Sequence, residues 1–155
     1  MAYLFGWILL CELAGIIGVF FTTPAIPTWY ASLVKPSFSP PNWIFGPVWT
    51  LLYALMGVAV YRIWKLGTKR KGVRQALTWF FVNLTLNALW SPIFFGAQQI
   101  AAAFIIISAI WVTIIMLVFR FHTLDKISAY LLIPYLLWVS FATVLNYNLW
   151  LLNTA

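Results

Sequence analysis

The sequence predicts an all-α integral membrane protein, a bundle of five transmembrane helices in a single domain over residues 1–155. Three observations carry this prediction. First, 65% of the residues are hydrophobic and only 7% are charged, whereas soluble domains are about half apolar and about a quarter charged. Second, five stretches are long enough to cross a bilayer, which takes about 20 apolar residues. Third, the cations gather in two of the connections between these stretches.

The predicted spans follow one another with short connections. They are residues 3–22, 43–64, 76–95, 100–119 and 127–151. Transmembrane β-strands are alternating segments of about ten residues, and the sequence shows no such pattern. No internal repeat is evident, and an odd helix count argues against the two-fold repeat that is common among secondary transporters.

The first predicted span, residues 3–22, is expected to be a retained helix, because it lacks a basic leader and is too long for the apolar core of a signal peptide. It carries the single cysteine, Cys11, so no internal disulfide can form. It also carries Glu12, the one acid within a span, and an intramembrane carboxylate is a functional candidate by default. No span offers a cation at its depth, so we expect Glu12 to be a neutral acid that hydrogen-bonds a neighbouring helix.

The connection before the second span is dense in proline and aromatic residues. Proline fixes φ and lacks an N–H, so residues 36–41 cannot form the interior of a helix. The residue before each proline is also biased toward extended geometry. This stiff loop leads from Tyr30 into the second span at Trp43, an arrangement suited to covering a pocket.

Helical spacing gathers aromatic and amide side chains on single faces of three spans. In the second span this face holds Trp49, Tyr53, Met56 and Val60. In the third span it holds Asn83, Asn87, Trp90, Ser91 and Phe94. In the fifth span it holds Pro134, Trp138, Ala142, Leu145 and Asn146. Unpaired amides are costly in hydrocarbon, so the two asparagines of the third span should point inward. They either join helices or serve as polar groups in an aromatic-walled cavity for a flat apolar ligand, and spacing leaves both interpretations open.

The sequence holds ten tryptophans, and they divide by position. Those near the predicted helix ends are typical of the aromatic belts at membrane interfaces: Trp7, Trp29, Trp43, Trp64, Trp79 and Trp150. Those that lie deeper are Trp49, Trp90, Trp111 and Trp138. The deeper group is a candidate for cavity walls, with ordinary packing as the alternative.

The net charge of +7 follows membrane topology rather than nucleic-acid binding. Six of the nine cations lie within residues 62–74, two more are Arg120 and Lys126, and Lys35 stands alone. The positive-inside rule then places the N-terminus and the loop 65–74 in the cytoplasm. The loop 23–42 and the C-terminus are expected on the opposite side, and the lipid bilayer, with its anionic headgroups, is the expected partner.

Catalytic and metal-binding groups are scarce. His122 lies in a charged connection, and Asp125 and Glu12 lie on different segments, which makes them a poor acid–base pair. The sequence has no Cys/His cluster, Ser-His-acid set or glycine-rich phosphate loop. We therefore expect no catalytic residue, no metal site and no obligatory cofactor.

Residues 29–57 resemble the tryptophan-rich sensory protein/translocator protein family (TSPO, also called the peripheral-type benzodiazepine receptor): they read W-Y-A-S-L-V-K-P-S-F-S-P-P-N-W-I-F-G-P-V-W-T-L-L-Y-A-L-M-G. Residues 86–96, L-N-A-L-W-S-P-I-F-F-G, and residues 132–146, L-I-P-Y-L-L-W-V-S-F-A-T-V-L-N, are similar to the third and fifth helices of that family. The segment C-E-L-A-G in the first span is also similar, so the resemblance covers essentially the whole chain.

The resemblance implies a five-helix protein, usually a homodimer, with a pocket under the first loop. That pocket binds porphyrins such as protoporphyrin IX and haem, as well as isoquinoline carboxamides and benzodiazepines. The ligand-binding residues that it implies here are Tyr30, Trp49, Asn83, Asn87, Trp90, Trp138 and Ala142. We add Tyr53, which shares the face of Trp49. For some members the family also implies light-dependent breakdown of porphyrin, although nothing in this sequence indicates turnover.

The expected function is therefore a membrane receptor or sensor for porphyrins, in tetrapyrrole handling or stress regulation. One alternative is a proton-coupled small-molecule transporter that uses Glu12, since small multidrug transporters carry one glutamate in their first helix; those proteins have four helices and lack the 29–57 pattern. A purely structural membrane protein is another. For eukaryotic members the resemblance also implies cholesterol binding through a C-terminal L/V-x-Y-x-K/R pattern. Here that pattern lacks its cation after Tyr147, although the same loose pattern occurs at Val58, Tyr61 and Lys65, so the sequence leaves sterol binding open. For a dimer contact, Ala14-x-x-x-Gly18 and residues 101–103 offer close helix approach.

Overall fold

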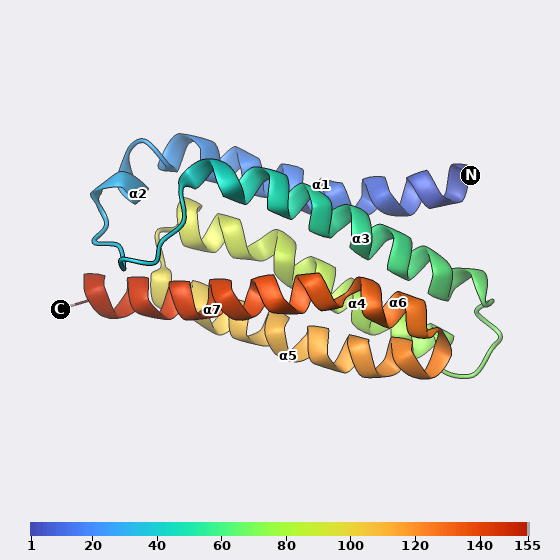
Figure 1. The fold of residues 1–155 in the computed structure, drawn as a ribbon. Helices are drawn as coiled ribbons and strands as arrows, with labels where there is room; N and C mark the ends of the chain where they lie inside the picture. The colour runs from blue at the N-terminus through green and yellow to red at the C-terminus, as the bar shows by residue number, and fades with distance from the viewer. Residues whose placement is uncertain (155) are drawn as a thin grey trace.

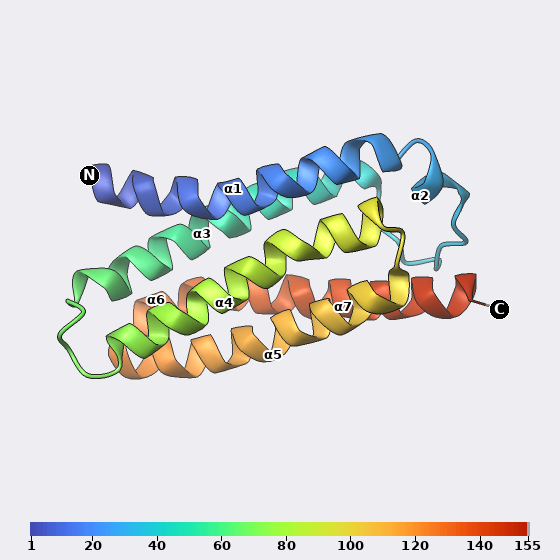
Figure 2. The same ribbon diagram turned by 180° about the vertical axis from the view of Figure 1, so that it is seen from behind.

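The computed structural model describes residues 1–154, which form helices and connections without a β-strand. The long helices lie side by side in an elongated bundle (Figures 1 and 2); they are α1 (Ala2–Ala25), α3 (Phe45–Lys65), α4 (Val73–Ser91), α5 (Ile100–Leu124) and α7 (Ile133–Asn153). The short helical segments are α2 (Trp29–Ser32), η1 (Asn42–Ile44), η2 (Pro92–Gly96) and α6 (Lys126–Leu131).

Four helical stretches within the described residues are long and apolar enough to cross a membrane, namely Ala2–Ala25, Asn42–Lys65, Ile100–Leu124 and Lys126–Asn153. The protein is thus a multi-pass α-helical membrane protein. The third predicted span, residues 76–95, is not among these stretches. Its helix, α4, contains Arg74, Gln75 and two asparagines, which lower its hydropathy.

Prolines set the helix boundaries that differ from the prediction. The predicted span 127–151 is two helices, α6 and α7, because Pro134 lies in the first turn of α7 and has no N–H to continue the ladder from α6. The predicted span 76–95 likewise changes at Pro92 from α-helix to the π-helical turn η2. The first helix runs on through Pro24 to Ala25, and the predicted proline-rich loop 23–42 contains the short helix α2.

The basic connections lie at the same end of the bundle as the N-terminus, and the opposite end carries α2, the proline-rich loop and the end of α7 (Figures 1 and 2). Arg62 of α3 joins Asp125 there through two bonds, Nε to Oδ2 at 2.7 Å and Nη2 to Oδ1 at 3.1 Å. Asp125 also accepts the N–H of Ser128, at 3.2 Å, as the N-cap of α6. The bonds from Arg62, followed by those from Ser128, lower the pKa of Asp125 to about 2. The two basic connections are thereby held together at one end.

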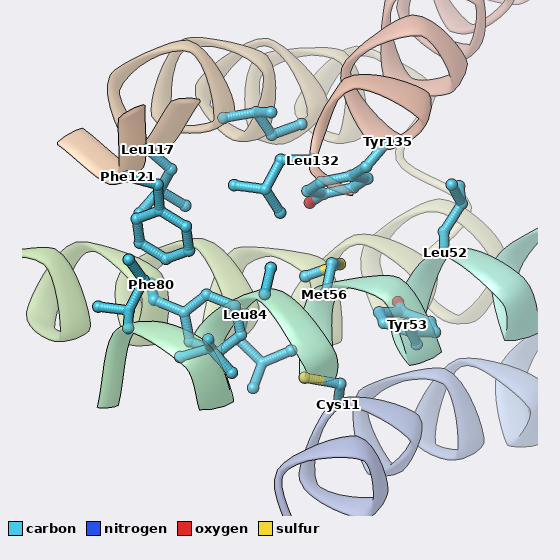
Figure 3. Close-up of a cluster of buried hydrophobic side chains, with 14 of the residues drawn as sticks. Cys11, Leu52, Tyr53, Met56, Phe80, Leu84, Leu117, Phe121, Leu132 and Tyr135 are labelled. Carbon is cyan, nitrogen blue, oxygen red and sulfur yellow. The ribbon is translucent and has the colours of Figure 1, made fainter. Parts of the chain in front are cut away.

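The core of the bundle is apolar and aromatic (Figure 3). Met56, Phe80, Phe121 and Tyr135 converge from four helical segments and are fully buried. Close packing continues to α1, where Cys11 is fully buried against this cluster.

Small residues bring α1 close to its neighbours in the same chain. A Cβ atom at Gly18 would lie 3.0 Å from Oγ of Ser91, and one at Gly15 would lie 2.8 Å from Cε2 of Tyr53. Ala14 is only 4% exposed. The prediction that Ala14 and Gly18 offer a dimer contact is therefore wrong, because this face of α1 is covered within the chain.

Candidate functional site

A cavity of about 420 Å³ lies in the half of the bundle next to the proline-rich loop. All five long helices contribute to its lining. Small-molecule pockets fall between about 300 and 1,000 Å³ and are mostly apolar with a few polar groups. The size and position of this cavity therefore suit a small molecule held inside the bundle.

Two stacked aromatic pairs form much of the cavity wall. Trp49 stacks on Tyr53, one helical turn away on α3, with ring centroids 5.4 Å apart. Trp90 stacks on Phe94 across the junction of α4 and η2, with centroids 4.9 Å apart and planes 22° apart. Tyr30 of α2 closes the loop side and is 4% exposed. Flat rings that are already ordered offer a large apolar contact area to a flat ligand.

One asparagine of α4 lines the cavity and the other supports it. Asn87 lines the cavity and uses its Nδ2 to donate to the carbonyl of Asn83, at 3.0 Å, and to the hydroxyl of Tyr135. That hydroxyl donates in turn to Oδ1 of Asn83 at 3.0 Å. Asn83 does not line the cavity; its Nδ2 donates to Oγ1 of Thr113 on α5 at 2.8 Å. Both asparagines therefore join α4 to other helices, and Asn87 also lines the cavity; its contact with a ligand stays a prediction.

The Oδ1 atom of Asn87 accepts no hydrogen bond from any of the described residues 1–154. Asn87 is 6% exposed, and it is exposed at the cavity. Its amide therefore presents an acceptor to whatever occupies the cavity, with the N–H side fixed by the protein.

Asn146 of α7 is a cavity residue that the site prediction missed. Its Oδ1 accepts the indole N–H of Trp90 at 3.2 Å, and its Nδ2 donates to the carbonyl of Ile100 at 3.0 Å. These bonds orient the Trp90 ring at the cavity wall. Asn146 fell on the predicted inner face of the fifth span, but only the tertiary structure, which brings its side chain to that of Trp90, gives it this role.

Glu12 also lines the cavity, from α1. Among residues 1–154 no hydrogen-bond partner for its carboxyl group is found, so the expected bond to a neighbouring helix is wrong.

Trp138 lies behind the wall rather than in it. Its ring packs edge-on against Phe45, with centroids 5.7 Å apart, and Phe45 lines the cavity. The indole N–H of Trp138 is buried and has no partner in the described part of the chain. The structure thus brings seven predicted residues to the cavity, namely Glu12, Tyr30, Trp49, Tyr53, Asn87, Trp90 and Ala142, and leaves Asn83 and Trp138 outside it.

No group of three or more His, Cys, Asp and Glu side chains that could hold a metal occurs within residues 1–154. His122 is exposed in the last turn of α5, next to the ring of Tyr130. The polar side-chain groups at the cavity are amides, hydroxyls, indole N–H groups and one carboxyl group.

The long apolar helices and the cavity between them define a multi-pass membrane protein with a candidate site for a small molecule. The chain belongs to the TspO/MBR family, whose family model matches residues 7–151.

The relatives come from archaea, bacteria and animals. The chain is 44% identical to the tryptophan-rich protein TspO of Archaeoglobus fulgidus over 139 residues, which cover 90% of this chain and 89% of that protein. It is 38% identical to the translocator protein of Bos taurus, over 94% of this chain and 86% of that protein. It is 38% identical to the tryptophan-rich sensory protein of Cereibacter sphaeroides, over 81% of this chain and 77% of that protein.

Proposed function

We propose that this protein is a membrane receptor that binds porphyrins, such as protoporphyrin IX or haem, in the cavity beneath the proline-rich loop, and acts in tetrapyrrole handling or stress regulation. The observation that carries the proposal is the pair of aromatic stacks, Trp49 on Tyr53 and Trp90 on Phe94, in the wall of a 420 Å³ cavity. A macrocycle is flat and mostly apolar, so it matches walls of this kind.

The polar groups of the cavity suit the ring centre of a porphyrin. Oδ1 of Asn87, which accepts no bond from residues 1–154, can take a hydrogen bond from a pyrrole N–H of metal-free protoporphyrin IX; haem has no such N–H. The indole N–H of Trp90 already donates to Asn146, so Trp90 offers a ligand its ring surface and no hydrogen-bond donor. Ala142 adds only a methyl group to the α7 wall, which leaves room for a broad ligand. Trp138 contributes indirectly, by supporting Phe45.

The proposal includes five membrane spans, with α4 and η2 as the third. Together they cover residues 73–96, which at about 1.5 Å per residue are long enough to cross the hydrocarbon core of about 30 Å. The amides of Asn83 and Asn87 are hydrogen-bonded inside the bundle, so neither faces lipid unpaired. We also propose that the basic end faces the cytoplasm, and that the protein is a homodimer of single-domain chains.

Quenching of tryptophan fluorescence by protoporphyrin IX in detergent tests the site. We expect saturable quenching, with a Kd raised by about two- to tenfold in Trp49→Phe and in Asn87→Ala, because each loses one contact worth about 0.5–1.5 kcal/mol. Trp138→Phe should have a smaller effect, since Trp138 does not line the cavity.

The matched control is Trp111→Phe, which removes a tryptophan that is 38% exposed and lies outside the cavity. Its Kd should equal that of the wild type. Non-saturable quenching of equal size in all variants would show that the porphyrin only partitions into the micelle, and would refute the proposal.

The position of Glu12 favours one second candidate, a proton-coupled transporter. Glu12 lines the cavity, and its carboxyl group has no hydrogen-bond partner in residues 1–154. In a transporter this group could release its proton when a substrate binds in the cavity. In liposomes with an imposed pH gradient, a transporter should show gradient-driven uptake that Glu12→Gln abolishes. A receptor should show no such uptake in either form, and Glu12→Gln should still bind porphyrin.

A further inference from the structure

Lys35 stands apart from the other cations of the protein. Eight of the nine Lys and Arg residues lie toward the end of the bundle that holds the N-terminus (Figure 1): Arg62, Lys65, Lys69, Arg70, Lys71, Arg74, Arg120 and Lys126. Lys35 lies at the opposite end, in the loop between α2 and η1. A rule that gathers cations on one side of the membrane does not explain a lysine on the other side.

The ammonium group of Lys35 lies over the ring of a residue of the cavity wall, although Lys35 itself does not line the cavity. Its Nζ atom is 4.7 Å from the centroid of the Tyr30 ring, within cation–π range. Tyr30 lines the cavity, so one face of a wall residue carries this positive charge. The two acids of the sequence are elsewhere: Asp125 is at the far end of the bundle, bonded to Arg62, and Glu12 lies inside the cavity. Lys35 forms no ion pair with any of the described residues.

The backbone next to Lys35 is held in place. The side-chain amide of Asn153, near the end of α7, forms two hydrogen bonds with Val34: the N–H of Val34 donates to Oδ1 and Nδ2 donates to the carbonyl of Val34, each at 2.9 Å. On the other side, Pro36 has a fixed φ. A cation carried by an anchored backbone loses less freedom on binding than one on a mobile loop.

The lining of the cavity itself contains no Lys, Arg or His side chain among residues 1–154. A carboxylate buried there would have no cationic partner, and an unpaired buried charge is costly. A flat ligand that carries carboxylates on one edge would therefore bind with that edge at the rim.

We propose that Lys35 is the carboxylate-binding subsite of the cavity, and that it selects flat apolar ligands bearing an acidic edge and fixes which edge points outward. This inference rests on the proposed porphyrin binding and deepens it by naming the specificity determinant. The ligand chemistry is a macrocycle with carboxylate side chains on one edge, as in protoporphyrin IX. The ammonium group would exchange part of its cation–π contact with Tyr30 for a charge-assisted bond to the ligand.

The test compares protoporphyrin IX with its dimethyl ester, which keeps the macrocycle and removes both charges. Kd values for both are measured by tryptophan quenching in neutral detergent, for the wild type, Lys35→Gln and Lys35→Arg. The ratio of the ester Kd to the acid Kd is compared between variants, so that the different partitioning of the two ligands into micelles cancels. An ammonium–carboxylate pair at a half-exposed rim should make this ratio about fivefold larger in the wild type than in Lys35→Gln. Lys35→Arg should restore it.

The matched control is Lys69→Gln, which removes the same charge at the other end of the bundle and should leave the ratio unchanged. In the wild type, the acid should also lose affinity as salt rises, because the pair is near solvent. The same ratio in Lys35→Gln as in the wild type would overturn the inference while leaving porphyrin binding intact. The absence of saturable binding by either ligand would instead refute the proposed function itself.

A final arm separates a ligand carboxylate from a lipid phosphate as the partner of Lys35. The Kd ratio is measured again in nanodiscs of neutral lipid and of anionic lipid. If the wild-type ratio exceeds that of Lys35→Gln in both kinds of nanodisc, Lys35 binds the carboxylate of the ligand. If that difference between the wild type and Lys35→Gln disappears in anionic lipid, Lys35 binds the lipid headgroup, and the inference is overturned.

Discussion

Gly57→Ala should destabilise the bundle by about 3 kcal/mol, the upper range for forcing extra volume into a packed interior. A Cβ atom at Gly57 would lie 2.5 Å from Cα of Ile8 and 2.9 Å from its backbone nitrogen. Because the obstacle is the backbone of α1 rather than a flexible side chain, α1 and α3 must move apart. We expect a lower midpoint of thermal unfolding in detergent and weaker porphyrin binding, since both helices line the cavity.

Gly6→Ala is the control for this prediction. It makes the same substitution in α1, where a Cβ atom has no neighbour within 4 Å. Alanine is a better helix former than glycine by up to about 1 kcal/mol, so this variant should be as stable as the wild type or slightly more stable. A Gly57→Ala protein that unfolds at the wild-type temperature would contradict the close packing of α1 on α3.

Asn83→Ala should destabilise the protein by about 2–3 kcal/mol. The substitution removes the bond to Thr113 and the acceptor for the hydroxyl of Tyr135. Interhelical hydrogen bonds in membranes are worth about 0.6–2 kcal/mol each, and a buried group left without its partner costs about 1–3 kcal/mol. Thermal unfolding in detergent measures the loss.

The exposed amide of Asn148 provides the comparison, because it bonds only to the carbonyl of Val144 in its own helix. Asn148→Ala should change stability by less than about 0.5 kcal/mol. The porphyrin Kd adds a second measurement, since Asn83 does not line the cavity. If Asn83→Ala were as stable as the wild type but lost porphyrin, Asn83 would be a ligand contact and its structural role would be refuted.

The two asparagines of α4 show what a repeat along one helix can predict. Their spacing of four residues places both on one face, and both are indeed buried. The cavity begins between them, at the level of Asn87, because Tyr135 of α7 and Thr113 of α5 fill the space around Asn83. The direction of both side chains was predictable; the depth of the cavity was not.

The sequence by itself determined the membrane class, the long helices, the stiff loop and the inward faces. These depend on local properties: runs of apolar residues, the restricted φ of proline and the period of the helix. It also determined the family, since the 29–57 pattern is continuous in the chain. The signals for the interruptions at Pro92 and Pro134 were present as well, although the predicted spans ran through them.

Only the tertiary structure decided which of these residues meet. Asn146 accepts the indole N–H of Trp90, and Phe45 lies between Trp138 and the cavity. Glu12 lines the cavity without a hydrogen-bond partner in the described residues. Lys35 lies over the ring of Tyr30. The contact of Lys35 with Tyr30 forms within the single connection between α1 and η1, whereas the other facts depend on the distance and relative rotation of segments that are remote in sequence. Those are set by contacts such as that of Gly57 with Ile8, where the absence of a single side chain sets how closely two helices approach.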